Sequence, residues 1–286
     1  MTRSPNRIAI LMATYNGAKY LREQIDSLLA QTCQDWHLFI HDDGSSDDTM
    51  SIVNQYIETH PDKITILDYP SQGGACKNFL SMLEQVDSSY YTFCDQDDVW
   101  LPEKIEKAFE CIRMIESQTP DIPVVINTDL TVVDSNKNVI APSFWEYENI
   151  YPSWIRSYDD HAALHYVTGC TMLFNKKAKE VTKRPYNRAT MHDTWIALST
   201  IAARGTIHNL CDSYILYRQH GENTLGAKDA KVQTFYFKLQ HFREVLRLNI
   251  NHFKEINAIR EISIADYIIA KIRYRRFVLD KTKKRT

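Results

Sequence analysis

The sequence contains no apolar run near the roughly 18 residues that a membrane-spanning helix needs. Its first residues, MTRSPNR, lead into only about six apolar residues, which are too few for the apolar core of a signal peptide. None of the six cysteines forms a CxxC pair, and their spacing does not suit zinc. We therefore expect a cytoplasmic protein with reduced thiols, whose contact with any membrane would be peripheral.

The chain also has little net charge, only −2, but that charge is unevenly distributed. Residues 271–286 carry +7, which leaves −9 on the rest of the chain. A basic end of this kind could bind anionic lipid, nucleic acid or another subunit, or it could be a solvated tail. Because the body is acidic, we expect no nucleic-acid partner. Peripheral membrane contact and a homo-oligomer both stay open.

Apolar runs and helical periodicity alternate through the first 120 residues. We predict strands at 8–13, 36–41, 64–67 and 90–94, and helices at 18–31, 48–58, after Gly73-Gly74 and at 102–117. This alternation is typical of an α/β fold with a Rossmann-like, mostly parallel central sheet and helices on both faces. We therefore expect one such domain over residues 1–227.

The later part of the chain follows a different pattern. Strands are predicted at 124–126, within 130–140 around a turn, at 167–174 and at 213–218, and a helix at 193–203. Residues 141–165 are rich in Tyr, Trp, Pro and His, which suggests a surface segment or a lid over a cleft. From residue 228 the pattern is helical, which predicts a basic, helical C-terminal extension over 228–286.

Polar loops follow three of the predicted strands. They are Thr14-Tyr15-Asn16, Asp42-Asp43-Gly44 and Asp95-Gln96-Asp97-Asp98. Ligands of such sheets bind outside the carboxyl ends of the strands, so these loops should converge on one crevice. The sequence contains neither GxGxxG after the first strand nor GxxxxGK[ST], so nucleotide phosphates would have to be held in another way.

Three carboxylates lie within four residues, at Asp95, Asp97 and Asp98. Like charges this close together cost free energy unless a cation neutralises them. Mg²⁺ and Mn²⁺ prefer oxygen ligands and often bridge carboxylates to substrate phosphates. We therefore expect a metal and diphosphate site here, with a solvated acidic turn as the alternative.

Together these motifs resemble the family 2 glycosyltransferases with the GT-A fold. The resemblance rests on Ala13-Thr14-Tyr15-Asn16, on DDGSSDDT at 42–49 and on DQDD at 95–98, and it covers roughly residues 5–225. It implies an inverting, metal-dependent enzyme that moves a sugar from a UDP- or dTDP-sugar to a hydroxyl of a glycan. The segments DQDDVW, HDTW and YRQHGEN are similar to those of bacterial enzymes that build surface polysaccharides, including rhamnosyltransferases.

The resemblance implies a nucleotide-binding role for two of the loops. Thr14 and Tyr15 would line the base and ribose pocket, with Asn16 beside them. Asp42 would hydrogen-bond the base, and Asp43 lies next to it. For Asp43 the alternative is a capping role in the turn before the following helix.

The resemblance likewise implies a set of metal and phosphate ligands. Asp97 would be the principal ligand of Mn²⁺ or Mg²⁺, Asp98 a second ligand or a supporting acid, and Asp95 a contact to the ribose or the metal. His220 is a candidate metal ligand and Arg218 a candidate phosphate partner. A structural role is the alternative for each of these last two.

The base of the reaction is expected in the segment Met191-His192-Asp193-Thr194-Trp195. In an inverting transfer a carboxylate takes the proton of the attacking hydroxyl, and the resemblance assigns this role to Asp193. Asp193 could also be the N-cap of the helix that follows, and both roles can hold together. His192 is expected to orient or pack, and Lys77 resembles a position near the base or the sugar.

Two rival functions remain. A nucleotidyltransferase acting on a sugar phosphate would need a Gly-rich loop with Arg or Lys after the first strand, where this chain has TYNGAKYL. An inactive nucleotide-sugar binder would not need the full set of acids. The acceptor could be a lipid-linked oligosaccharide, another glycan, or a glycan on a secreted adhesin.

Overall fold

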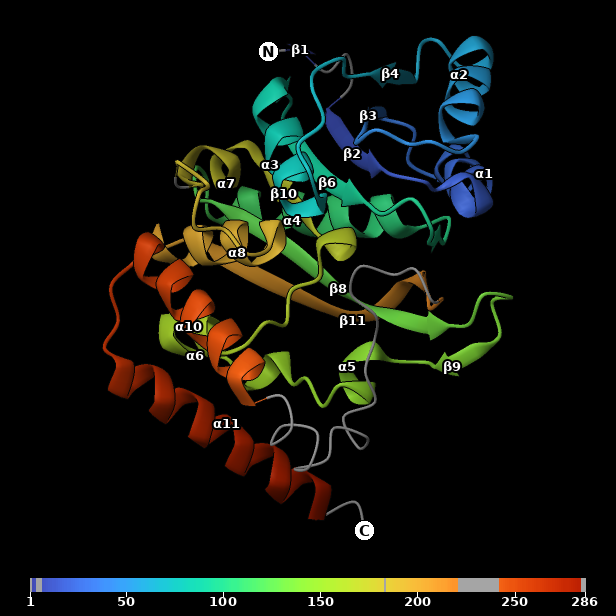
Figure 1. Ribbon diagram of the computed structural model, residues 1–286. Helices are drawn as coiled ribbons and strands as arrows, with labels where there is room; N and C mark the ends of the chain where they lie inside the picture. Colours follow the sequence, from blue (N-terminus) through green and yellow to red (C-terminus); the bar gives the residue numbers. More distant parts are fainter. Residues whose placement is uncertain (1, 4–6, 183, 221–241, 284–286) are drawn as a thin grey trace.

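The computed structural model describes residues 2–3, 7–182, 184–220 and 242–283. Within these residues a nine-stranded mixed sheet has the order β4-β3-β2-β6-β10-β8-β11-β7, with β9 paired to β8 (Figure 1). Its strands are β2 (Ile8–Thr14), β3 (Trp36–Asp42), β4 (Ile64–Ile66), β6 (Tyr90–Cys94), β7 (Val99–Trp100), β8 (Val124–Val133), β9 (Val139–Ala141), β10 (Leu173–Asn175) and β11 (Thr206–Arg218). The short strands β1 (Thr2–Arg3) and β5 (Val86–Asp87) form a separate parallel pair.

The sheet is parallel on one side and mixed on the other. Strands β4, β3, β2 and β6 run parallel, β10 is antiparallel to both of its neighbours, and β8 and β11 are parallel. The helices are α1 (Ala18–Leu29), α2 (Thr49–Thr59), α3 (Ala75–Gln85), α4 (Lys104–Gln118), α5 (Phe144–Tyr147), α6 (Tyr158–Ala163), α7 (Lys176–Val181), α8 (His192–Ala202), α10 (Phe242–Ile259) and α11 (Ile264–Lys283). The expected α/β sheet flanked by helices is therefore confirmed.

Alternation along the central strands explains the layers. Ile8, Ile10 and Met12 of β2 pack with side chains of α1, α2 and α4 on one face of the sheet. Ala9 and Leu11 pack with side chains of α3 and α8 on the other face. Successive side chains of a strand point to opposite faces, so a strand that is buried on both sides reads as the continuous apolar run seen here.

The middle of the chain differs in part from expectation. Residues 141–165 form α5, a 3₁₀ turn at Pro152–Trp154 and α6; most of them are exposed or half-buried, as expected of a surface segment, although Trp145 and Tyr158 are buried. The strand predicted at 167–174 is reduced to β10, and a 3₁₀ turn at Gly169–Thr171 precedes it. The last strand is longer than predicted, because β11 begins at Thr206 rather than at residue 213.

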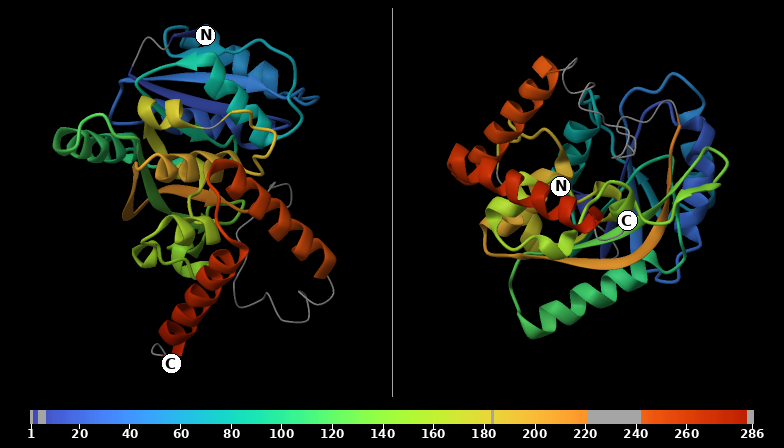
Figure 2. Two further views of the ribbon diagram at one scale, coloured as in Figure 1. Left: turned by 90° about the vertical axis from the view of Figure 1, so that its left-hand side faces the viewer. Right: turned by 90° about the horizontal axis from the view of Figure 1, so that it is seen from below.

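The C-terminal helices pack on the mixed half of the protein. Ile256 and Ile259 of α10 and Tyr267 of α11 share a buried cluster with α6 and α8. The basic segment is therefore the end of a helix as far as Lys283, and α11 extends away from the sheet (Figure 2). Among the described residues, no helix has the length and apolar character needed to cross a membrane. The expected boundary at 227/228 lies outside the described residues.

Candidate active site

The polar loops predicted to converge do meet at one edge of the sheet. They line a cavity of about 1000 Å³ together with the first turn of α8 and the segment 165–169. The carboxyl ends of β2, β3 and β6 supply one wall, since these strands are parallel neighbours. The other lining residues come from much later in the chain, chiefly from 165–169 and 191–194. A cavity of this size fits a ligand as large as a nucleotide sugar.

The loop after β2 is held to the loop after β3 by hydrogen bonds. The hydroxyl of Thr14 donates to Asp42 Oδ1 at 2.9 Å. The backbone N–H of Asn16 donates to Ser45 Oγ at 2.8 Å, while the Asn16 side-chain oxygen accepts from the N–H of Ser46. Asp42 also accepts from the N–H groups of Gly44 and Ser45. Its carboxylate is therefore used within the turn, and Asp42 is not among the residues that line the cavity.

Asp43 faces the cavity and holds the loop before α3. Its carboxylate accepts from the backbone N–H groups of Gln72, Gly73 and Gly74 at 2.6, 3.1 and 2.7 Å, and from the Ser71 hydroxyl. Burial alone would raise the pKa of Asp43, but the hydrogen bonds from Ser71 and the backbone lower it. Asp43 thus stays ionised, and it caps residues 71–74 rather than the turn before α2.

Gln96 connects the loop after β6, residues Asp95–Asp98, which we call the acidic loop, to the loop after β2. Its side-chain oxygen accepts from the N–H of Tyr15, and its amide donates to the Tyr15 carbonyl, both at 2.9 Å. These two hydrogen bonds resemble the pairing of neighbouring strands and fix the backbone of Tyr15, a residue that is 58% exposed and lines the cavity. No local sequence pattern predicts this contact, because Tyr15 and Gln96 are 81 positions apart in the chain.

Asp97 of the acidic loop contacts His220 at the surface of the cavity. His220 Nε2 lies 2.8 Å from Asp97 Oδ2, and both residues line the cavity. Arg218 lies behind them and is almost fully buried. Its Nε donates to the Asp97 carbonyl at 2.8 Å, and its guanidinium also pairs with Glu23. Arg218 therefore shapes the acidic loop from within and does not line the cavity.

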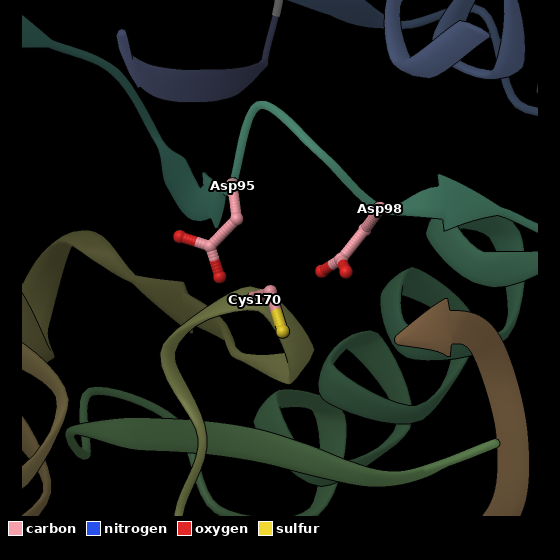
Figure 3. A group of neighbouring side chains, drawn as sticks. All are labelled: Asp95, Asp98 and Cys170. Atoms are coloured by element: carbon pink, nitrogen blue, oxygen red, sulfur yellow. The ribbon is translucent and has the colours of Figure 1, made fainter. Parts of the chain in front are cut away.

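Asp95, Asp98 and Cys170 form a compact group whose ligand atoms lie within 4.8 Å of one another (Figure 3). Asp98 accepts from the backbone N–H of Arg218 at 3.0 Å, and its Oδ2 is buried without a partner. Burial, reinforced by Asp97 and Asp193, raises the pKa of Asp95 to about 7. Burial and the neighbouring acids Asp97 and Asp95 also raise the pKa of Asp98 well above its usual range.

This electrostatic strain fits a divalent cation. A hard cation would offset the repulsion among these carboxylates. It would also offer a partner to the carboxylate oxygen that has none. Asp95 and Asp97 line the cavity, whereas Asp98 is fully buried and Cys170 offers a soft sulfur that Mg²⁺ and Mn²⁺ do not favour. The accessible oxygen donors are therefore those of Asp95 and Asp97.

Beneath the loop, the ammonium of Lys104 lies 3.4 Å from the centre of the Trp100 ring, and burial lowers the pKa of Lys104 to about 8.

Asp193 lies in the first turn of α8 and lines the same cavity as Asp95 and Asp97. Met191 occupies the N-cap position, so Asp193 is not the cap. One carboxylate oxygen accepts from the N–H of Gly169 at 3.1 Å, and the other accepts from the N–H and hydroxyl of Thr194. Burial raises the pKa of Asp193 to about 6, which is near the range in which a carboxylate works as a general base.

His192 packs beneath this carboxylate. Its ring lies 4.4 Å from that of Phe79 and 4.7 Å from that of Phe93, and burial lowers its pKa to about 3. A Cβ on Gly169 would lie 2.5 Å from the His192 ring, so only glycine allows this approach. The expected packing role of His192 is therefore seen.

The cavity brings together eight of the predicted site residues and leaves out four. Those that line it are Thr14, Tyr15, Asn16, Asp43, Asp95, Asp97, Asp193 and His220. Those that do not are Asp42, Lys77, Asp98 and Arg218; Lys77 is exposed and the others are turned into the protein. Sequence reasoning gave no role to Gln96 or to the cavity residues Tyr20, Phe79, His165 and Thr168.

Comparison with known proteins identifies relatives of this chain. The sequence profile of "Glycosyl transferase family 2" matches residues 9–182. The chain is 30% identical over 269 residues to the dTDP-rhamnosyl transferase RfbG of Shigella flexneri, covering 87% of this chain and 83% of that protein. It is 35% identical to an uncharacterised glycosyltransferase of Nostoc sp., covering 86% of this chain and 75% of that one.

Solved structures show the same fold at low sequence identity. A mannosyltransferase from Pyrobaculum calidifontis in complex with GDP-Man and Mn²⁺ matches with a TM-score of 0.62 at 16% identity, covering 97% of this chain and 70% of that one. TarS 1–349 of S. aureus in complex with UDP-GlcNAc matches with a TM-score of 0.59 at 18% identity, covering 94% and 71%. These likenesses show that the chain has the GT-A fold.

Proposed function

The chain belongs to family 2 of the glycosyl transferases, and we propose that it moves a sugar from a UDP- or dTDP-sugar to a hydroxyl of a glycan acceptor with inversion at the anomeric carbon. The observation that carries this proposal is that Asp193 lines the same cavity as Asp95 and Asp97. A donor diphosphate against the acidic loop would therefore place its sugar before a buried carboxylate.

The nucleotide would bind between the loops after β2 and β3. Thr14, Tyr15 and Asn16 line this part of the cavity, and the exposed ring of Tyr15 offers a face on which a base can stack. Asp43 is the ionised acceptor that faces the cavity here, so we assign to it the contact with a base N–H that the sequence had suggested for Asp42. Asp42 would hold the turn.

A Mn²⁺ or Mg²⁺ ion would be held by Asp95 and Asp97, with His220 beside them. When bound, the ion would supply positive charge next to the leaving diphosphate, where charge develops. Asp98 and Arg218 would keep the loop in place from below, since both are buried behind it. The carboxylate of Asp98 contributes no surface to the cavity.

Asp193 would act as the general base. Its carboxylate takes the proton of the acceptor hydroxyl while that oxygen bonds to the anomeric carbon and the bond to the diphosphate breaks. Attack from the face opposite the leaving group inverts the anomeric centre.

The donor assay tests this function directly. Radiolabelled UDP- and dTDP-sugars are incubated with the protein and Mn²⁺, and slow donor hydrolysis without acceptor is measured. A transferase hydrolyses one donor slowly, an inactive binder hydrolyses none, and a nucleotidyltransferase acts instead on a nucleoside triphosphate and a sugar phosphate. Asp193→Asn should lower hydrolysis by about 10²- to 10⁴-fold with donor binding retained. Full activity in this variant would rule out the base.

The acidic loop allows a matched pair of variants. Asp97→Asn should weaken Mn²⁺-dependent donor binding by about tenfold or more, since a charged ligand is lost. Asp98→Asn should change it by less than about threefold, because that side chain is buried and can donate as an amide. Calorimetric titration of donor with and without Mn²⁺ measures both, and equal losses in the two variants would make Asp98 a direct ligand.

The donor and acceptor are proposed from the relatives. Similarity to a dTDP-rhamnosyl transferase favours dTDP-rhamnose among the donors. The acceptor would be a lipid-linked oligosaccharide or another glycan of a bacterial polysaccharide, with a glycan on a secreted adhesin as the alternative. Transfer to synthetic lipid-linked and free oligosaccharides, followed by mass spectrometry, distinguishes them.

We also propose that α11 lies on anionic lipid at the inner face of the cell membrane. This helix contains six basic and two acidic residues. Its outer surface exposes Ile264, Ile268, Ile269, Ile272 and Leu279. Apolar side chains flanked by Arg275 and Arg276 are typical of a helix that lies in the membrane interface.

Vesicle flotation tests this location. The protein should float with vesicles that contain phosphatidylglycerol and not with pure phosphatidylcholine. Replacing Ile268, Ile272 and Leu279 by serine should abolish flotation, whereas Met114→Ser, an exposed apolar residue on α4, should not. If the triple variant instead dissociates an oligomer in the absence of lipid, the face pairs two copies and the lipid proposal is wrong.

A further inference from the structure

The C-terminal helix α10 reaches the loop that leads into α8. Glu255 of α10 is fully buried, and its carboxylate accepts from both the backbone N–H and the hydroxyl of Thr190. The N–H contact is 2.9 Å. Thr190 lies two residues before α8 begins and three before Asp193. A residue 65 positions away in sequence therefore determines where the chain enters the helix that carries Asp193.

His252, one turn earlier in α10, supports Glu255. Its Nδ1 lies 3.2 Å from the Glu255 carboxylate, and its Nε2 lies 2.8 Å from the carbonyl oxygen of Ala162 in α6. The ring of His252 therefore lies within hydrogen-bond distance of both Glu255 and α6. Two such contacts on a buried ring restrict the position of the Glu255 carboxylate.

A second line of contacts runs from His252 to the other side of Asp193. The ring of His252 lies 3.7 Å from that of His165, which lines the cavity. His165 Nδ1 lies 3.1 Å from the hydroxyl of Thr194, and that hydroxyl is hydrogen-bonded to the Asp193 carboxylate. Burial, together with the charge of His252, lowers the pKa of His165 to about 3, so His165 is neutral.

We propose that Glu255 and His252 are positioning residues for Asp193, holding it from both sides through Thr190 and through His165 and Thr194. The proposal rests on the proposed role of Asp193 as the base. It makes α10 part of the catalytic machinery although α10 does not line the cavity. Misplacement of a reacting group by about 1 Å can cost about 10²-fold in rate, so an effect on turnover without a contact to substrate is expected.

A purely structural role for α10 makes a different prediction. Loss of Glu255 would then lower the melting temperature, as any buried substitution does, and leave the turnover of the folded protein unchanged. Ile259→Ala is a matched control for this, because Ile259 is buried in the same helix among α6, α8 and α11 and makes no contact with Thr190 that the structure records.

The test compares Glu255→Ala, Glu255→Gln, Thr190→Val, Thr190→Ser and Ile259→Ala. The probe is slow hydrolysis, with Mn²⁺, of the donor that the wild-type protein hydrolyses from the panel above, at temperatures where each variant is folded. Glu255→Ala should lower kcat about tenfold or more with donor Kd within about twofold of wild type. Glu255→Gln should recover most of kcat, because its amide oxygen can still accept from the Thr190 N–H.

Thr190 provides a second measurement that does not depend on a buried substitution. Its side chain is exposed, so Thr190→Val should fold, lower kcat several-fold and be rescued by Thr190→Ser. Hydrogen exchange measured by mass spectrometry should show faster exchange in residues 189–194 in Glu255→Ala and not in Ile259→Ala. Unchanged kcat in Thr190→Val and Glu255→Ala, or an equal loss in Ile259→Ala, overturns the proposal.

The Asp193→Asn variant distinguishes failure of the positioning role from failure of the proposed role of Asp193 as the base. If Asp193→Asn is inactive and Glu255→Ala is not impaired, the positioning role fails and the base stands. If Asp193→Asn is fully active, the assignment of the base fails, and any loss in Glu255→Ala then has another cause.

Discussion

At the scale of single residues, the carboxylates of this cavity differ because their surroundings differ. Asp43 accepts several backbone N–H bonds, which lower its pKa, whereas Asp193 accepts two such bonds yet burial raises its pKa to about 6. A base must be deprotonated before the reaction and still hold a proton afterwards, and a pKa near 6 permits both at neutral pH. The two acids are thus suited to different tasks, one to binding and one to proton transfer.

This difference predicts the pH dependence of turnover. The pKa of Asp193 is raised from 3.8 to about 6, and only its ionised form accepts a proton. With Mn²⁺ and donor saturating, kcat should be constant above about pH 7 and fall about tenfold per pH unit well below pH 6. Initial rates from pH 4.5 to 8.5 measure this limb. A flat profile down to pH 4.5 would mean that another group takes the proton.

At the scale of elements, the sequence predicts strands and loops well where local pattern determines them. The apolar runs of β2, β3 and β6 are buried on both faces, and the acids that follow them lie at the expected edge of the sheet. A strand was also predicted at 167–174, yet only its last two residues belong to β10, and Gly169–Thr171 form a buried 3₁₀ turn. Periodicity cannot distinguish these cases, because the Gly169 N–H bonds to Asp193 instead of to a strand.

The candidate site shows the same limit. The resemblance of the motifs pointed to Asp95, Asp97 and Asp193, and these three residues do line one cavity. It could not show that Asp42 turns away while Asp43 faces the cavity, since both belong to one turn. Nor could it reveal Gln96 or Glu255, whose partners lie 81 and 65 residues away and leave no local pattern.

The two loops joined by Gln96 should act as one element. Gln96→Ala removes both bonds to the Tyr15 backbone, and we expect donor Kd to rise about three- to tenfold, at about 1 kcal/mol for the pair in net terms. Gly17→Ala should do the same, because its Cβ would lie 2.1 Å from Gln96 Oε1 and displace that side chain.

A double-mutant cycle measured by donor titration tests this coupling. The Gly17→Ala/Gln96→Ala protein should bind donor no more weakly than Gln96→Ala alone, since both changes remove one contact. Gln55→Ala, on the distant helix α2, is the control and should bind as wild type. Fully additive losses would show that Gly17 and Gln96 act independently.

At the scale of the whole molecule, α10 and α11 belong to the core of the mixed half. Ile256 and Ile259 of α10 pack with Trp195 and Leu198 of α8, and α8 carries Asp193. The Tyr274 hydroxyl of α11 donates to the Asn149 carbonyl at 2.8 Å and so reaches the segment before α6. The last helices are therefore not an appendage that could be removed without effect on the cavity.

Two truncations test this integration. Burial of Ile256 and Ile259 contributes about 3–6 kcal/mol, a large part of the roughly 5–15 kcal/mol by which a domain is stable. A chain ending at residue 241 should therefore be insoluble or lose cooperative unfolding in calorimetry. A chain ending at residue 275 removes only the last turns of α11 and retains Tyr267 and Tyr274, so it should unfold cooperatively and bind donor with wild-type affinity. Cooperative unfolding of the shorter chain would make α10 dispensable, and the link from α10 to Asp193 would then lose its structural basis.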